Sequence, residues 1–146
     1  MLKSFEISNG SIEEVVQVME MLPEFNFPLK TKQEINEKLF GRKHQILIAK
    51  SETDFVGFKL SYDLGDNVLY SWLGGVLPSF REKGIAKALA KHQENWAITN
   101  GFTKVRFKTL NKHKAMLCFA LKNGFDITDV DKSQQPAKII LEKELL

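Results

Sequence analysis

Residues 74–89 have the sequence GGVLPSFREKGIAKAL. This stretch is the most informative part of the chain about its fold. It begins as the end of a strand and turns, after a proline, directly into a helical pattern. The first backbone N–H groups of a helix have no partner within the helix, and the helix dipole adds positive potential there. Such a turn binds anions, and Gly84 and Ala86 leave its main chain open to a phosphate. Arg81 and Lys83 add positive charge.

Two other phosphate-binding loops are excluded by their spacing. The P-loop requires Gly-Lys-Ser/Thr, whereas Gly84 is followed by Ile85. The dinucleotide fingerprint requires three spaced glycines at the turn, and Gly84 stands alone. Taken by itself, such a short motif is more often an ordinary turn glycine before a helix than a phosphate-binding loop. The elements on either side of it must therefore distinguish the two.

Strand and helix periodicities alternate on both sides of the loop. They predict strands at 3–8, 45–51, 55–62, 68–76, 104–110, 125–130 and 138–146, and helices at 11–21, 31–39, 85–100 and 112–123. Capping boxes at 11–14 and 31–34 support the first two helix starts. A helical return between two successive strands makes them parallel. The pattern therefore predicts an α/β (α+β) fold: a mixed, mostly antiparallel sheet of about seven strands, one central parallel pair, and about four helices.

Composition favours one domain over residues 1–146. The chain has 146 residues, 43% of them hydrophobic, which suits a single packed core. Its net charge of +3 (21 basic minus 18 acidic residues) is scattered, so a nucleic-acid partner is not indicated. The longest apolar run, at 115–121, has seven residues, whereas a membrane span needs about 20. One cysteine, Cys118, excludes an internal disulfide. We expect a cytoplasmic monomer or homodimer without a metal, because no ligand pair has metal-site spacing.

The loop in its context resembles a known family. The pattern V-x-P-x-x-R-x-x-G-x-A of residues 76–86 is similar to the acyl-CoA signature of the GNAT superfamily of N-acetyltransferases. The Asn-Gly-Phe of residues 123–125 is similar to the Gly-Phe that closes the family's last helix. The order of the predicted elements resembles the family along the whole chain.

This resemblance implies a cofactor site and a reaction. The CoA pyrophosphate would lie on the amides of Arg81, Glu82, Lys83, Gly84, Ile85 and Ala86, and pantetheine would pair with Gly74, Gly75 and Val76. The family splays its fourth and fifth strands around the thioester, and an amide of the bulged fourth strand polarises the carbonyl. The implied function is acetyl transfer from acetyl-CoA to a primary amine, of a small molecule or a protein, by direct attack. The alternative is a related module that binds acyl-CoA without turnover.

The tyrosine that often protonates the departing thiolate in this family is missing. Counting the Ala-x-x-x-Tyr spacing from Ala115 places Phe119 at its position, whereas counting back from Gly124 places Ala120 there. The asparagine that precedes the family's last helix is correspondingly Asn111 or His113. We take Asn111 and Phe119 as the cofactor contacts, and the general acid stays open.

The general base is also open. Counting back from Arg81 places Tyr70 where the histone acetyltransferases of the superfamily carry a glutamate. A phenol with a pKa near 10 is a poor base at neutral pH, so Tyr70 is expected to orient a water or the acceptor. Glu24 and His44 are other candidates, although nothing local marks either.

Several side chains outside the loop have simpler interpretations. His92 lies on the apolar face of the predicted long helix and is expected to be a core or edge histidine, and Cys118, in an apolar helical run, is expected in the core. The alternating Lys104, Arg106 and Lys108 predict a solvated basic strand face that would attract an anionic cofactor. Apolar residues between the first two helices predict a lid on the acceptor site: Phe25, Phe27 and Leu29.

Overall fold

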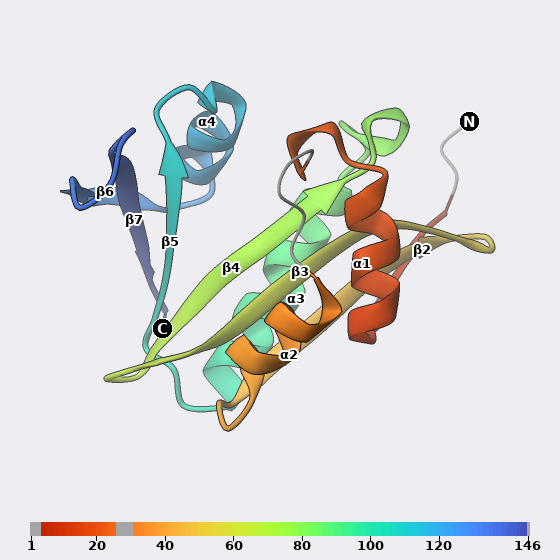
Figure 1. Cartoon of the computed structure of the whole chain (residues 1–146), viewed down its shortest axis with the longest axis horizontal. Helices are drawn as coiled ribbons and strands as arrows, with labels where there is room; N and C mark the ends of the chain where they lie inside the picture. Colours follow the sequence, from red (N-terminus) through yellow and green to blue (C-terminus); the bar gives the residue numbers. More distant parts are fainter. Residues whose placement is uncertain (1–3, 26–30, 146) are drawn as a thin grey trace.

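The computed structural model describes residues 4–25 and 31–145, with only the backbone of Glu24 (Figure 1). Its elements in chain order are β1 (Glu6–Asn9), α1 (Ile12–Glu20), α2 (Lys32–Leu39), β2 (His44–Ser51), β3 (Asp54–Gly65), β4 (Val68–Val76), α3 (Ile85–Thr99), β5 (Lys104–Leu110), α4 (Lys114–Lys122), β6 (Asp126–Asp131) and β7 (Lys138–Glu144). Single 3₁₀ turns follow α1 at Pro23–Phe25 and β4 at Pro78–Phe80.

The strands form one seven-stranded sheet in the order β1-β2-β3-β4-β5-β7-β6. Every neighbouring pair is antiparallel except β4 and β5, which are parallel. The predicted fold class is therefore confirmed, including the central parallel pair. The predicted bounds differ at a few ends: β3 continues through Gly65, and α4 starts at Lys114 because His113 is its N-cap.

Both predicted capping boxes are present. In α1 the Ser11 hydroxyl accepts a hydrogen bond from the Glu14 amide at 3.2 Å, and the Glu14 carboxylate accepts one from the Ser11 amide at 2.8 Å. In α2 Thr31 and Glu34 make the same reciprocal bonds, both at 3.1 Å. Each box satisfies two backbone donors that the first turn of a helix leaves without partners, so these four residues set where the helices begin.

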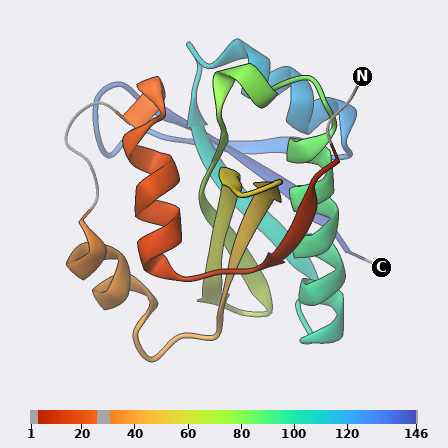
Figure 2. The ribbon, with the colours of Figure 1, turned by 90° about the vertical axis from the view of Figure 1, so that its right-hand side faces the viewer.

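The helices cover the sheet on two sides. Figure 2 shows α1 and α3 on opposite faces, with the strands between them. The largest fully buried side chain, Phe58 of β3, lies in the main core with the buried Val15 and Met19 of α1. The buried residues of α1 are Val15, Val18 and Met19, whereas Ile12 and Val16 are only partly buried.

The buried face of α3 is rotated from the predicted one. Ile85, Leu89, Gln93 and Ala97 are buried, spaced by four residues, whereas His92 is exposed. The expectation that His92 lies in or near the core is wrong. Gln93 replaces it because its side-chain amide donates to the Ser71 hydroxyl of β4 at 3.2 Å, and a buried amide needs such a partner.

The sheet opens between its two halves. The parallel ladder of β4 and β5 has three residue pairs, ending at Tyr70 opposite Arg106, and the strands then diverge as a V in Figure 1. In the second half, Leu117 and Ala120 of α4 pack against Leu141 of β7. Cys118 lies between these two buried positions and is exposed, so its expected place in the core is wrong. Within the described part of the chain, no helix is both long and apolar enough to cross a membrane.

Candidate functional site: a splayed strand edge that leads into a helix N-terminus

The loop that follows β4 has an open main chain at the start of α3. Gly84 is the N-cap of α3 with φ +85°, and Glu82 also has a left-handed backbone, with φ +62°. A Cβ added at Gly84 would meet no atom within 4 Å. The first helical hydrogen bond joins the Ala88 amide to the Gly84 carbonyl at 3.0 Å, so the amides of residues 85–87 precede the helical ladder. No side chain caps them. This is the geometry that anion binding requires.

Arg81 ties the loop to the strand. Its Nε donates to the carbonyl of Val76, the last residue of β4, at 2.9 Å. The guanidinium therefore holds the loop against the end of the strand. Lys83 is exposed on the loop and supplies the positive charge that faces solvent.

The edge of β4 beyond Tyr70 faces the gap between the two half-sheets. Gly74 and Gly75 lie on this edge and pair on their other side with Lys59 and Phe58 of β3. Since the ladder with β5 ends at Tyr70, this edge can take an extended ligand as an additional strand. Packing also requires a glycine at position 75, because a Cβ there would lie 2.6 Å from Cδ1 of Leu22.

A β-bulge lies where the two halves separate. Leu60 of β3 pairs with Leu73, and Ser61 pairs with Ser71, so Trp72 is an extra residue in β4. Bulges bend a strand and re-aim its groups, and they are frequent beside active sites. The bulge adjoins the last pair of the parallel ladder, at Tyr70. The bend, the strand edge and the loop thus follow one another along β4.

Aromatic side chains line the sheet beside the bulge. The Tyr62 ring centroid lies 5.4 Å from that of Tyr70 and 5.7 Å from that of Trp72. Burial raises the pKa of Tyr70, as does the carboxylate of Asp131, while Arg106 opposes the shift. The Tyr70 phenol therefore stays protonated at neutral pH, and its O–H can donate a hydrogen bond.

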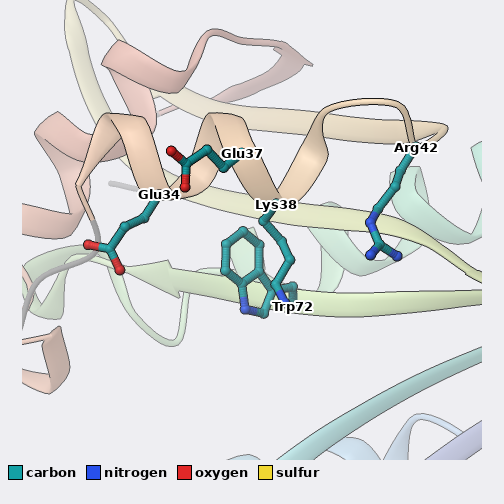
Figure 3. A pocket seen from close by; sticks show the side chains of 5 residues that line it. All are labelled: Glu34, Glu37, Lys38, Arg42 and Trp72. Carbon is teal, nitrogen blue, oxygen red and sulfur yellow. The ribbon is translucent and has the colours of Figure 1, made fainter.

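A cleft of about 430 Å³ lies between α2 and β4. It is lined by Glu34, Glu37, Lys38, Arg42 and Trp72 (Figure 3). Figure 3 shows Lys38 beside the Trp72 indole, with Arg42 at the far end of the helix. The sequence interpretation did not single out Lys38 or Arg42, because solvent-exposed cations near a helix end carry no local signal of a site.

The basic face of β5 is paired rather than solvated. Lys108 forms an ion pair with Asp131 at 2.9 Å, and Arg106 forms one with Glu142. Lys104 lies 3.5 Å from Glu142. Hydrogen bonds from Ser133 and Lys108 hold the pKa of Asp131 well below its usual range, so the carboxylate is charged. The predicted basic face is present and partly exposed, but acidic residues of β6 and β7 neutralise its charge, which weakens the expected attraction for an anionic cofactor.

The candidate cofactor contacts on and before α4 differ in how far they are buried. Ala120 is buried against the second half-sheet, whereas Phe119 is partly buried. Asn111 is exposed, and its side-chain oxygen accepts from Nζ of Lys114 at 3.0 Å. His113, the alternative to Asn111, is exposed at the N-cap of α4.

The other candidates have the following places. His44 is exposed, and its Nδ1 lies 2.9 Å from the Arg42 carbonyl oxygen. Phe25 packs in the core, with its ring centroid 6.0 Å from that of Phe58. Phe27, Leu29 and the side chain of Glu24 lie outside the described residues. Among the residues that are described, no three His, Cys, Asp or Glu side chains gather as metal ligands would.

Comparison with known proteins identifies the family. The model of the acetyltransferase (GNAT) family matches residues 12–125, and the chain belongs to this family. No match was found among curated protein sequences.

Solved structures share the fold. Ard1 from Thermoplasma volcanium superposes with a TM-score of 0.84 at 17% identity, covering 97% of this chain and 98% of that one. The ribosomal-protein-S18-alanine N-acetyltransferase of Escherichia coli gives 0.82 at 10% identity, covering 97% and 94%. PaiA N-acetyltransferase from Thermoplasma acidophilum, solved in complex with coenzyme A, gives 0.78 at 20% identity, covering 97% and 99%.

Proposed function

We propose that this chain transfers an acetyl group from acetyl-CoA to a primary amine. The observation that carries the proposal is the continuous path along β4. Its bulge at Trp72, its edge at Gly74–Val76 and the open loop at Gly84 follow in the order that a thioester, pantetheine and pyrophosphate would need.

In this proposal the phosphates bind the amides of residues 81–86, and Lys83 adds charge. Pantetheine pairs with the edge of β4 as an extra strand. The thioester then lies at the bulge, where an amide of β4 donates a hydrogen bond to its carbonyl oxygen. A preorganised donor of this kind stabilises the negative charge that develops there in the transition state.

The reaction is a direct displacement. The neutral amine nitrogen bonds to the acetyl carbon, the C–S bond of the thioester breaks, and the sulfur leaves with the bonding electrons. The nitrogen loses one proton and the thiolate gains one, so the products are an N-acetyl amine and CoA. Tyr70, whose phenol stays protonated, orients the amine or a water that carries its proton. Catalysis is then mainly positioning.

A second candidate function is acyl-CoA binding without turnover. The observation that favours it is the pair of side chains at the two possible acid positions, Phe119 and Ala120, neither of which donates a proton. A nucleic-acid partner has less support, because the basic strand of β5 is neutralised by Asp131 and Glu142.

Two measurements separate these functions. Calorimetry with acetyl-CoA is expected to show one site per chain, and its absence would overturn both candidates. Release of CoA thiol in the presence of a panel of primary amines is expected for the transferase. Binding without release for every amine would leave the non-catalytic module.

A further inference from the structure

Two cations in the cleft beneath α2 are held over aromatic rings. Nζ of Lys38 lies 5.9 Å from the Tyr62 ring centroid and 6.0 Å from that of Trp72, and Cζ of Arg42 lies 5.2 Å from that of Tyr62. No carboxylate of the described residues comes within 4.0 Å of either cation. A ring holds a cation in place but accepts no conventional hydrogen bond from its N–H groups. Both cations therefore have donors to offer a ligand.

The carboxylates that line the same cleft are engaged within α2. Glu34 accepts the amide hydrogen of Thr31 at 3.1 Å as part of the capping box. Glu37 accepts from the side-chain amide of Gln33 at 3.1 Å. Figure 3 shows Glu34 near the N-terminal end of α2, Glu37 over the middle of the helix, and Arg42 beyond its C-terminal end. Both carboxylates thus have partners within α2 or at its cap, and neither forms an ion pair with Lys38 or Arg42.

The facing half of the sheet does not reverse the positive charge of Lys38 and Arg42. Tyr62 and Tyr70 lie between the two sides: the charge of Arg42 acts on Tyr62, and those of Arg106 and Asp131 act on Tyr70. On that side Asp131 and Glu142 are already in ion pairs with basic residues of β5. A cationic ligand on that side would have to break these pairs, whereas an anionic group finds Lys38 and Arg42 with no carboxylate of the described residues within 4.0 Å.

We infer that the acceptor is a small amine that also carries a carboxylate, which docks on Lys38 and Arg42. The inference rests on the proposed function. A carboxylate oxygen about 2.8 Å from Nζ of Lys38 lies within roughly 9 Å of the Trp72 ring centre, because Nζ is 6.0 Å from that centre. Trp72 is also the extra residue of the β4 bulge, so a carboxylate bound at Lys38 lies beside the side chain of the residue at which the proposed function places the thioester. A diamine or polyamine instead brings a second positive charge toward Lys38 and Arg42.

The first test is a rate comparison among matched acceptors. Each set contains an amino carboxylate, an alkylamine and a diamine of equal chain length, with two to five carbons. We expect the best amino carboxylate to exceed its alkylamine at least tenfold in kcat/KM, with the diamine slowest. The double variant Lys38→Met/Arg42→Met should abolish this preference while the KM of acetyl-CoA stays unchanged. Lys43→Met, which removes a neighbouring exposed cation, is the matched control and should keep the preference.

The second test does not depend on turnover. The chain has two tryptophans, so Trp96→Phe leaves Trp72 as the only indole to report on the cleft. With CoA present, N-acetylated amino carboxylates should change Trp72 emission and bind at least tenfold more tightly than the matched neutral N-acetyl alkylamines. The ratio should fall to about one in the double variant.

The outcomes separate the inference from the proposed function. Equal affinities of charged and neutral ligands, a preference that survives the double variant, or faster reaction with diamines would each overturn the inference. If acetyl-CoA binds and its thiol is released while one of these results is found, the proposed function stands and the inference alone fails. If no amine is acetylated, the fluorescence titration still decides whether the cleft selects a carboxylate.

Discussion

Gly75 and Gly84 border the same gap, but each is required for a different physical reason. At Gly75 the reason is steric, since a Cβ would lie 2.6 Å from Leu22 where the end of α1 packs on β4. At Gly84 a Cβ would meet nothing within 4 Å, and the reason is the left-handed backbone together with open space for a ligand. Substitutions at Gly75 therefore report on packing, and those at Gly84 report on the anion site.

Gly84→Asp is expected to weaken acetyl-CoA binding at least tenfold, or about 1.4 kcal/mol. The substitution places a carboxylate against the phosphates. Gly101→Asp is the matched control, because Gly101 has φ +84° and equally open surroundings beyond the other end of α3. Both variants should lose about 1 kcal/mol of stability from the left-handed backbone. Calorimetry on the two folded variants makes the comparison, and unchanged affinity in Gly84→Asp would remove the phosphate assignment.

Phe119→Tyr is expected to raise kcat where protonation of the leaving thiolate limits the rate. A positioned general acid contributes about 10²-fold or more, and the KM of acetyl-CoA should change little. Phe119→Leu is the control, expected to act only through packing, with a loss of about 1 kcal/mol in stability. Initial rates of thiol release measure both effects.

Ala120→Tyr tests the other counting of the last helix. Ala120 is buried, so a tyrosine there overpacks α4 against β7, and urea unfolding should show a loss of about 1–3 kcal/mol. A rate increase in this variant but not in Phe119→Tyr would favour the register counted from Gly124. If neither variant is faster and loss of another side chain abolishes turnover, the acid lies elsewhere.

At the scale of the elements, α2 forms one wall of the cleft and is short. It spans Lys32–Leu39, and its buried residues are Ile35 and Leu39. Isolated helices of this length are unstable, so the cap and the few packing contacts decide whether the helix persists. Lys38 and Arg42 depend on it for their positions over the aromatic rings.

Thr31→Ala is expected to raise the KM of the acceptor more than that of acetyl-CoA. Loss of the capping box costs about 1 kcal/mol and loosens the helix that carries Lys38. Ser11→Ala removes the equivalent box of α1, which does not line the cleft, and serves as the control. Steady-state kinetics with both substrates varied provide the measurement. An equal effect of the two substitutions on the KM of the acceptor would contradict the role given to α2.

At the scale of the whole molecule, long polar side chains help to join the two halves of the sheet. Beyond the short β4–β5 ladder, Lys143 of β7 forms an ion pair with Glu94 of α3 at 2.9 Å. The charge of Glu94 also acts on Lys59 of β3. Burial of Lys59 lowers its pKa to about 8, an effect that the charge of Glu94 partly opposes. The Lys59 ammonium is therefore poorly solvated.

Lys59→Met is expected to stabilise the protein near neutral pH, and the gain should vanish at high pH. Below pH 8 Lys59 is charged in the folded and unfolded states, and the full cost of burying the charge is present. Between pH 8 and about 10.5 Lys59 is deprotonated in the folded state but still protonated in the unfolded state. The free energy of unfolding of the wild-type protein therefore rises relative to that of Lys59→Met. The largest difference, at pH 7, is about 3 kcal/mol at most.

Urea unfolding of Lys59→Met at pH 7, 8.5 and 10 checks this dependence. Lys43→Met removes the same charge from an exposed position and is the control. A stability difference between wild type and Lys59→Met that is constant over this range would show that Lys59 is well solvated.

The features that the sequence predicted correctly are local ones. The starts of α1 and α2 follow from two capping boxes, each contained in four residues. The open main chain predicted at the start of α3 is present, because a Cβ added at Gly84 would meet no atom within 4 Å. The binding roles of this loop, of Gly74–Val76, and of Tyr70, Asn111 and Phe119 remain predictions.

The errors concern features that depend on a distant partner. His92 is exposed and Gln93 is buried in its place, where the side-chain amide has a hydrogen-bond partner, Ser71, on another element. The basic strand of β5 is neutralised by Asp131 and Glu142, which adjacent strands bring alongside it. Local periodicity contains no information about either partner.

The sequence by itself determined the number and order of the elements, the parallel central pair and the loop at the start of α3. The elements and the loop depend on backbone preferences among residues close together in the chain. The parallel pair follows from the helix between its two strands, since a helical return makes successive strands parallel. Only the tertiary structure decided how far β4 and β5 separate, where β4 bulges, and that Lys38 and Arg42 lie over Tyr62 and Trp72. Such contacts join residues from separate elements, and their positions follow from the packing of the whole core rather than from any single segment.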